Sequence, residues 1–153
     1  IGVMCCCQAE DGIRDLVRSR VLGDVYKRQG ITLRPVSGKI ATMGDPAEIT
    51  AKMLGETLSV AIHEPTGTVA ATNPTGNILT FWNLKEQRLI KSLEMTRPLG
   101  VALTLDGKDF CGSYVPSGVP SLQRFDAQTL EPVTGSKIEG AFMSGSHIIA
   151  YDL

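Results

Sequence analysis

The feature of this 153-residue chain that most constrains its fold is an internal repeat with a period of 41 residues. The tripeptide Val60-Ala61-Ile62 recurs as Val101-Ala102-Leu103, and the turn that follows it recurs with one residue deleted. Three more pairs of runs then match: residues 69–72 with 110–113, 79–83 with 122–126, and 87–89 with 128–130. A period near 40 residues with four β-rich runs in each unit is typical of a β-propeller blade.

Short β-rich runs separated by turn signals continue along the chain after Gln29. They predict strands at residues 31–36, 58–63, 68–72, 77–82, 89–93, 100–105, 110–114, 121–125 and 147–151. A short helical turn is expected at residues 45–54, with Asp45 as a cap and Pro46 at the first helical position.

Side-chain size within the two repeats agrees with blades packed side by side. The small residues at 70, 71, 112 and 113 are expected in inner strands, where neighbouring blades leave little room. Trp82 and Phe125 are expected to fill the wedge between blades, and Asn83 and Asp126 to turn the chain with their own side chains.

The first 29 residues differ in character from the rest. Residues 9–29 closely resemble the translation of a sequencing-library adapter over about twenty consecutive positions, so residues 1–29 are interpreted as an artefact and left out of fold reasoning. Their apolar residues fall near helical spacing, which predicts a disordered arm or a short helix without function. The adjacent Cys5, Cys6 and Cys7 lie in or beside this segment, and three consecutive cysteines suit a tetrahedral metal site poorly.

Charge and composition exclude several classes of protein. Residues 30–153 carry 10 Lys or Arg and 12 Asp or Glu, a balance that argues against a nucleic-acid or anionic-membrane surface. A hydrophobic content of 42% is enough for a packed core. No apolar run approaches the roughly 18–20 residues that a membrane helix needs.

The repeat units resemble those of seven-bladed bacterial propellers of the WD40/YVTN type. Residues 60–83 reproduce the pattern "Val-Ala-x-x-Pro-x-Thr-Gly-x-Val-Ala-Ala-Thr-x-Pro-x-Gly-Asn…Trp-Asn" of a periplasmic family known only as a domain of unknown function. Residues 145–151 are similar to the closing strand of that family, although Ser146 departs from its usual Asn/His pair. The resemblance implies a periplasmic location and an iron-uptake setting, because members often sit beside genes for imelysin-like proteins.

On this basis the fold class is all-β, a partial β-propeller of about two full four-stranded antiparallel blades, part of a third and a closing strand, with a non-native N-terminal arm. The blades are expected at residues 58–98 and 99–140 and the closing strand at 145–153, so that residues 30–153 form the C-terminal portion of a longer propeller. Open faces would make such a portion prone to aggregation and only marginally stable.

Candidate chemical motifs all have a simpler structural interpretation. His63-Glu64 lacks the second histidine of a zinc-protease helix, and Ser37-Gly38-Lys39 lacks the upstream glycine of a phosphate loop. Asp106, Asp109 and Asp126 are interpreted as turn and loop residues, Cys111 as a small core residue, and His147 as unpaired with His63. The methionines at 43, 53, 95 and 143 are interpreted as core residues rather than soft-metal ligands. Asn73-Pro74-Thr75 is not a glycosylation site, because proline occupies its middle position.

The sequence therefore assigns no catalytic, cofactor-binding or metal-binding residue, and it leaves cofactors unknown. It favours a binding or scaffold module, with a protein of an iron-uptake system as a possible partner, no nucleic acid and no membrane span. The alternative is a propeller enzyme, lactonase- or dehydrogenase-like, whose site residues lie mostly in blades outside this chain.

Overall fold

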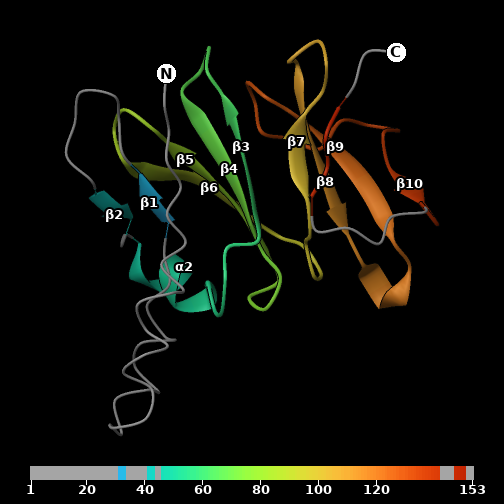
Figure 1. Cartoon of the computed structure of the whole chain (residues 1–153), viewed down its shortest axis with the longest axis horizontal. Coiled ribbons are helices and arrows are strands. Elements are labelled where there is room, and N and C mark those ends of the chain that lie inside the picture. Colours follow the sequence, from blue (N-terminus) through green and yellow to red (C-terminus); the bar gives the residue numbers. More distant parts are fainter. Residues whose placement is uncertain (1–30, 34–40, 44–45, 142–146, 151–153) are drawn as a thin grey trace, which may run out of the picture.

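The computed structural model describes residues 31–33, 41–43, 46–141 and 147–150 (Figure 1). The predicted arm at residues 1–29, the cysteines at 5–7, Ser37-Gly38-Lys39 and Met143 all lie outside these ranges. Within them the chain forms two four-stranded antiparallel sheets that stand side by side as propeller blades, together with a two-stranded hairpin and one short α-helix.

The first sheet contains β3 (Ser59–His63), β4 (Thr68–Asn73), β5 (Ile78–Asn83) and β6 (Arg88–Glu94) in chain order. Each strand is joined to the next by a tight turn, and every residue of β4 is buried. Because alternate side chains of a strand point to opposite faces, a strand buried at every position must be covered on both faces. This sheet is therefore the middle layer of the molecule.

The second sheet repeats this order with β7 (Val101–Leu103), β8 (Asp109–Tyr114), β9 (Ser121–Asp126) and β10 (Ile138–Glu139). A short 3₁₀ turn, η2 (Pro116–Gly118), joins β8 to β9. The register confirms the sequence repeat position by position: Ala70 pairs with Phe81 in the first sheet, and Cys111 pairs with Arg124 in the second. Phe81 and Arg124 are therefore equivalent positions.

The two sheets meet through one apolar cluster. Phe81 is fully buried, with its ring centroid 5.5 Å from that of Phe110 and 6.2 Å from that of Phe125, so a ring of one sheet lies against two rings of the other. At the inner edge the Ser59 hydroxyl is 3.3 Å from the Val101 carbonyl oxygen and accepts from the Val101 N–H at 3.1 Å. These contacts bring β3 and β7 together, as Figure 1 shows.

The opposite face of the first sheet is covered by β1 (Ile31–Leu33) and β2 (Ala41–Met43), which pair antiparallel. Ile31 and Met43 are buried in a second apolar cluster with Trp82, which supports the predicted role of this tryptophan as a wedge between layers. Phe125 has the same role at the other interface. The hairpin is the observed part of a third, preceding unit.

Several predicted boundaries need correction. The helix α2 (Ala47–Lys52) starts one residue later than expected, with Pro46 at the N-cap and no side-chain cap. Strands β2 and β10 were not predicted, since three and two residues are too short to show a pattern. The small residues at 70, 71, 112 and 113 lie in β4 and β8, which are second from the inner edge.

The predicted closing strand is not observed in its described part. Residues 147–150 have no regular secondary structure, although they lie against β7, and the remainder of residues 145–153 is outside the described ranges. The physical reason is pairing: a strand is defined by hydrogen bonds to a neighbour, and residues 147–150 make no β-ladder. No helix within the described parts of the chain is long and apolar enough to span a membrane.

Candidate functional site

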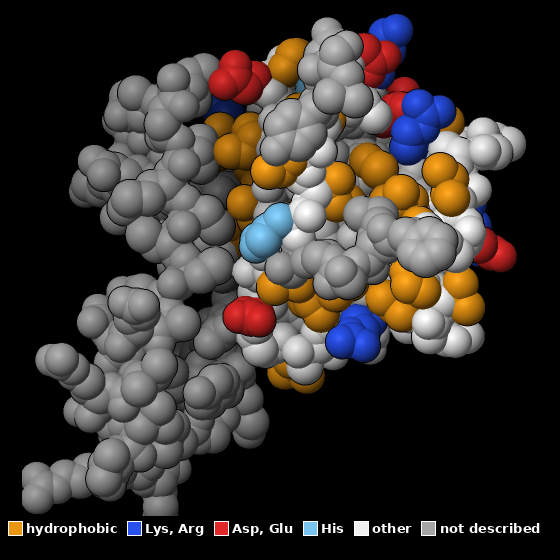
Figure 2. Space-filling view, turned by 45° about the vertical axis from the view of Figure 1, so that its right-hand side comes forward, with side chains coloured by type: hydrophobic (Ala, Val, Ile, Leu, Met, Phe, Trp, Pro, Cys, Tyr) orange, Lys and Arg blue, Asp and Glu red, His pale blue; other side chains and the backbone are white. Residues whose placement is uncertain are grey.

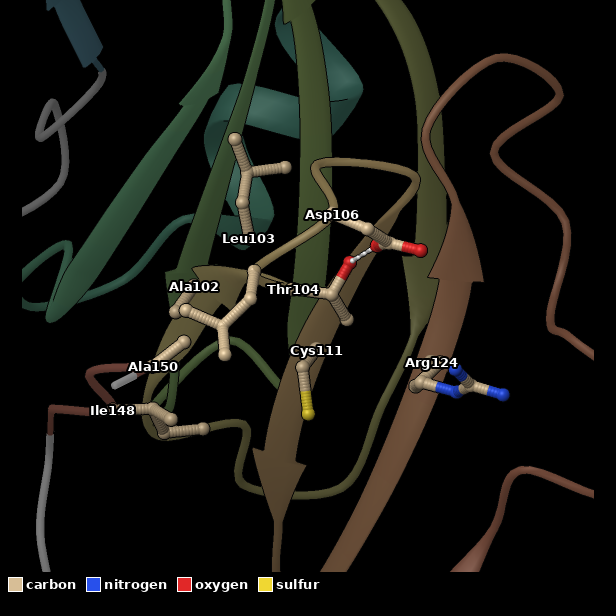
Figure 3. Close-up of a pocket in the computed structure, with 9 residues that line it drawn as sticks. Ala102, Leu103, Thr104, Asp106, Cys111, Arg124, Ile148 and Ala150 are labelled. Atoms are coloured by element: carbon tan, nitrogen blue, oxygen red, sulfur yellow. Dashed lines mark hydrogen bonds between the residues drawn. The ribbon is translucent and has the colours of Figure 1, made fainter. Parts of the chain in front are cut away.

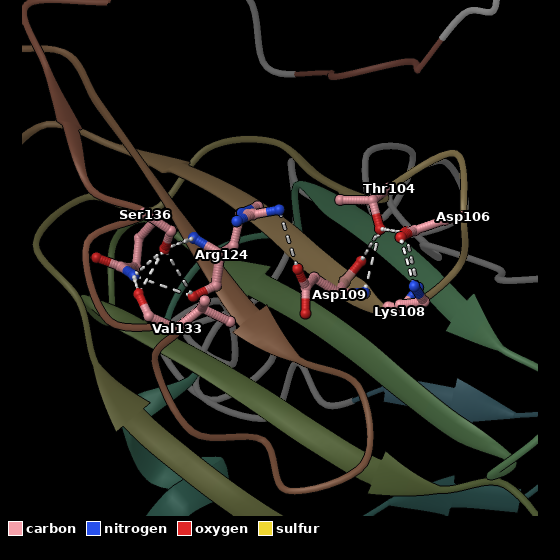
Figure 4. A network of polar contacts seen from close by, with 8 residues as sticks. Thr104, Asp106, Lys108, Asp109, Arg124, Val133 and Ser136 are labelled. Carbon is pink, nitrogen blue, oxygen red and sulfur yellow. Dashed lines mark hydrogen bonds and ion pairs between the residues drawn. The ribbon is translucent and has the colours of Figure 1, made fainter.

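The acidic residues of the second sheet hold turns together. Asp106 accepts a hydrogen bond from the Thr104 hydroxyl at 2.7 Å and another from the Lys108 N–H at 3.1 Å (Figure 4). The bond from Thr104, followed by the one from the Lys108 backbone, lowers the pKa of the Asp106 carboxyl. Asp126 accepts from the N–H groups of Gln128 and Thr129, at 2.9 and 2.7 Å. Both aspartates therefore have the turn role that the sequence predicts.

Asp109 differs from this expectation. It is the first residue of β8, its side chain is only 12% exposed, and its carboxylate lies 3.3 Å from the Arg124 guanidinium (Figure 4). The Arg124 backbone N–H donates to the Ser136 hydroxyl at 3.2 Å, which fastens the segment after β9 to the sheet. The prediction of a loop residue was wrong for Asp109, because the strand begins one residue before the apolar run that predicted it.

A cavity opens on the face of the second sheet that points away from the first (Figure 3). Its volume is about 430 Å³, and Ala102, Cys111, Arg124, Ile148 and Ala150 are among its lining residues. Cys111 is half-buried here rather than in the core, because its equivalent Ala70 is covered by a following sheet and Cys111 is not. Burial raises the pKa of the Cys111 thiol, against the opposing effect of Arg124, so the thiolate nucleophile is disfavoured.

A second candidate surface lies at one end of the sheets, where three connections meet. They are the β4–β5 turn, the β6–β7 connection and the η2 turn, and hydrogen bonds join them directly. The Met95 N–H donates to the Asn77 carbonyl at 2.9 Å, and the Arg97 N–H to the Asn77 side-chain oxygen at 2.8 Å. The Val115 N–H donates to the Thr96 carbonyl at 3.1 Å. We call these three connections (residues 74–77, 95–100 and 115–120) the loop platform.

The loop platform is conformationally costly and exposed. Asn77, Arg97 and Ser117 have φ angles of +52°, +46° and +49°, in the left-handed region that is unfavourable for residues other than glycine. All three side chains are exposed, and Val119 beside them is 44% exposed. The same left-handed backbone occurs at Gln87 and Leu130, at the opposite end of the sheets. The hydrogen bonds that join three exposed connections therefore make the platform the best candidate for recognition.

The remaining sequence predictions have mixed outcomes. His63 ends β3 beside a turn, as predicted, with its Nδ1 2.8 Å from the Thr66 hydroxyl and its ring edge against Phe110. The methionines at positions 43, 53 and 95 are buried in the two apolar clusters, also as predicted. His147 is exposed. Among the described residues no group of three or more His, Cys, Asp or Glu side chains could hold a metal ion.

The sequence signalled the pieces of the loop platform but not the platform itself. Turn signals at residues 73–76 and 116–118 marked two of its three connections. Nothing in the pattern showed that they lie at the same end of adjacent sheets, because that depends on β3 and β7 running side by side. The two turns follow the second strand of their repeat units, and this shared position was the one signal that could have placed them at the same end.

Solved structures match parts of this chain at low sequence identity. Among the similar solved structures are Kuenenia stuttgartiensis hydrazine synthase (TM-score 0.42, 19% identity, 51% of this chain and 22% of that one) and Saccharomyces cerevisiae Sqt1 (TM-score 0.46, 9% identity, 75% and 32%). This chain thus spans less than a third of the length of either. No curated protein sequence matches it.

One family model matches residues 19–149, most of the chain. The match begins inside the segment at residues 9–29 that resembles an adapter, so the boundary at residue 29 stays a prediction. By this match the chain belongs to DUF1513, a family described as proteins of unknown function.

Proposed function

We propose that this chain is part of a periplasmic propeller that works as a non-enzymatic binding or scaffold module beside an iron-uptake system, and that it docks a protein partner on the loop platform. The observation that carries the proposal is the coupling of three loops from two sheets through Asn77 and Thr96. A surface fixed in this way loses little conformational entropy when a partner binds.

The chemistry of the platform suggests the kind of partner. Arg97 is exposed, its backbone is held by Asn77, and Val119 offers apolar surface on the neighbouring turn. Arginine is enriched among the residues that dominate binding energy, since its planar guanidinium pairs with carboxylates in a defined geometry. The platform therefore suits an acidic surface on a folded protein.

The carboxylates of the second sheet support a scaffold rather than a catalyst. Asp106 and Asp126 serve turns and Asp109 pairs with Arg124, so each described aspartate has a structural partner. General acid–base catalysis requires such groups to converge on a reacting atom instead. The aspartates within the described residues are thus used by the fold itself.

The test is binding of the full chain to an imelysin-like protein from the same genome, measured by calorimetry. We expect a complex that weakens by about 10-fold or more on Arg97→Ala, the loss typical of a binding hot spot. Lys85→Ala is the matched control, because Lys85 is an exposed cation on the β5–β6 turn, at the opposite end of the same sheet.

Two results would count against the proposal. Equal binding by the Arg97 and Lys85 variants would remove the platform from the interface, and absence of binding would remove this partner class. Turnover of a lactone substrate by the chain, tested with and without divalent cations, would favour the lactonase-like alternative instead.

A further inference from the structure

The connection that enters the first sheet contains a helix that adds little to the core. The hairpin precedes the first sheet as the first sheet precedes the second, so the connection from β2 to β3 corresponds to the one from β6 to β7. The β6–β7 connection has no regular element, whereas the β2–β3 connection contains α2. No residue of α2 is buried, and only Ile49 packs in part against an apolar cluster. Core packing therefore gives little reason for a helix at this position.

Contacts at its C-terminal end fix α2 to the loop platform. Gly76 of the β4–β5 turn lies so close to the helix that a Cβ there would be 1.9 Å from the Lys52 carbonyl oxygen. The buried Asn73 side chain donates to the Glu56 carbonyl at 3.0 Å and accepts from the Gly76 N–H at 2.7 Å. Met53, directly after the helix, is fully buried. A helix of six residues is marginal by itself, so these contacts hold it at the end of the sheets where the platform lies (Figure 1).

Arg97 is a cation of the platform whose charge is available to another molecule. Lys52 of α2 is paired, with its Nζ 3.5 Å from a carboxylate oxygen of Glu94. None of the ion pairs among the described residues includes Arg97, and its side chain is exposed. An exposed guanidinium without a carboxylate in its own chain can bind one from a partner in a bidentate geometry.

Exposed apolar side chains stand on either side of this charge. The contacts run in series from α2 to the β4–β5 turn, then to the β6–β7 connection and on to η2. Leu54, two residues after α2, is 42% exposed at one end of this series, and Val119 is 44% exposed at the other. Arg97 lies between them, in the β6–β7 connection. An arginine among exposed apolar side chains has the composition of the centre of a protein–protein interface.

These segments stay accessible in a longer propeller. Sheets of a propeller pack face to face, as the two described sheets do, and the cavity and apolar side chains on the open face of the second sheet lie where a further sheet would pack (Figure 2). The loop platform and α2 lie instead at the ends of the strands (Figure 1). Addition of sheets on either side therefore leaves this end of the molecule open.

We propose, on the basis of the proposed function, that α2 and Leu54 form a second contact surface of the docking site. A folded protein partner places a carboxylate on Arg97 and covers Leu54 with apolar side chains of its own. The rigid attachment of α2 to the β4–β5 turn keeps Leu54 in a fixed place relative to Arg97, so little conformational entropy is lost on binding. The partner surface thus has an acidic group beside an apolar patch.

The test is calorimetric titration of the full chain with the imelysin-like protein. We expect Leu54→Ser to weaken binding by about 10-fold, because the apolar surface of the leucine is no longer buried against the partner. Ile90→Ser is the matched control, since Ile90 is 40% exposed on the outer strand β6, away from the loop platform, and its replacement should leave the affinity unchanged. Far-UV circular dichroism checks that each variant is folded.

Amide hydrogen exchange of the unsubstituted complex tests the same surface without a variant. Exchange should slow at residues 47–56 and 95–100 on binding, and should not change at the β5–β6 turn, residues 84–87, at the opposite end of the sheet.

The outcomes separate this inference from the proposed function. Loss of affinity on Arg97→Ala but not on Leu54→Ser, or slower exchange at residues 95–100 without a change at 47–56, would overturn the role of α2 and leave the platform as the docking site. Equal losses for Leu54→Ser and Ile90→Ser would overturn it too. Absence of binding, or no effect of Arg97→Ala, would overturn the proposed function and this inference with it.

Discussion

Replacement of Phe81 by alanine tests the central packing of the structure. Phe81 is fully buried and its ring contacts Phe110 and Phe125 of the adjacent sheet. Truncating a buried phenylalanine removes its transfer free energy and leaves a cavity, which together cost about 3–5 kcal/mol. A domain has only about 5–15 kcal/mol of stability, so we expect the variant to lose a large part of it.

Urea unfolding followed by the fluorescence of Trp82 measures this loss. Trp82 is the only tryptophan and is buried on the opposite face of the same sheet, so it reports on the first sheet as a whole. With an m-value of about 2 kcal/mol/M, the midpoint should fall by roughly 2 M. Leu105→Ala is the control, because Leu105 is 62% exposed and should change the free energy of unfolding little. A loss below about 1 kcal/mol for Phe81→Ala would refute the sheet-on-sheet packing.

Three further predictions concern the turns and the cysteine. Hydrogen bonds from the N–H groups of Thr129 and Gln128 lower the pKa of the Asp126 carboxyl in the folded protein below its value in the unfolded chain. The contribution of Asp126 to stability is therefore present above the unfolded pKa and is lost as pH falls through the folded pKa. Asp126→Asn should reduce this loss of stability in acid, measured as the melting temperature against pH. Gly76→Ala should destabilise the fold, because its Cβ would lie 1.9 Å from the Lys52 carbonyl oxygen, and an unchanged melting temperature would contradict that contact. With the other three cysteines replaced by serine, Cys111 should react with a thiol reagent more slowly at pH 7 than a free thiol, and the rate should continue to rise above pH 9, because burial raises its pKa.

The sequence predicted the blade architecture because the repeat shows which residues of the two units are equivalent. The repeat aligns Ala70 with Cys111 at a spacing of 41 residues, and Phe81 with Arg124 at a spacing of 43, and the observed strand pairs follow that alignment. Local chemistry also sufficed for the turns: Asn83 accepts hydrogen bonds from the N–H groups of Lys85 and Glu86, as its type and position predict. Such features depend on neighbours a few residues away.

Other properties depended on what lies against each sheet. Cys111 and Ala70 are equivalent in sequence, yet one lines an open cavity and the other is fully buried, because only the first sheet is followed by another within the described residues. The loop platform likewise forms only when β3 and β7 lie side by side and bring Val115 of the second sheet near Thr96. Sequence periodicity therefore determined the unit, while the packing of units in space decided which faces are core, which are open and where loops from different units meet.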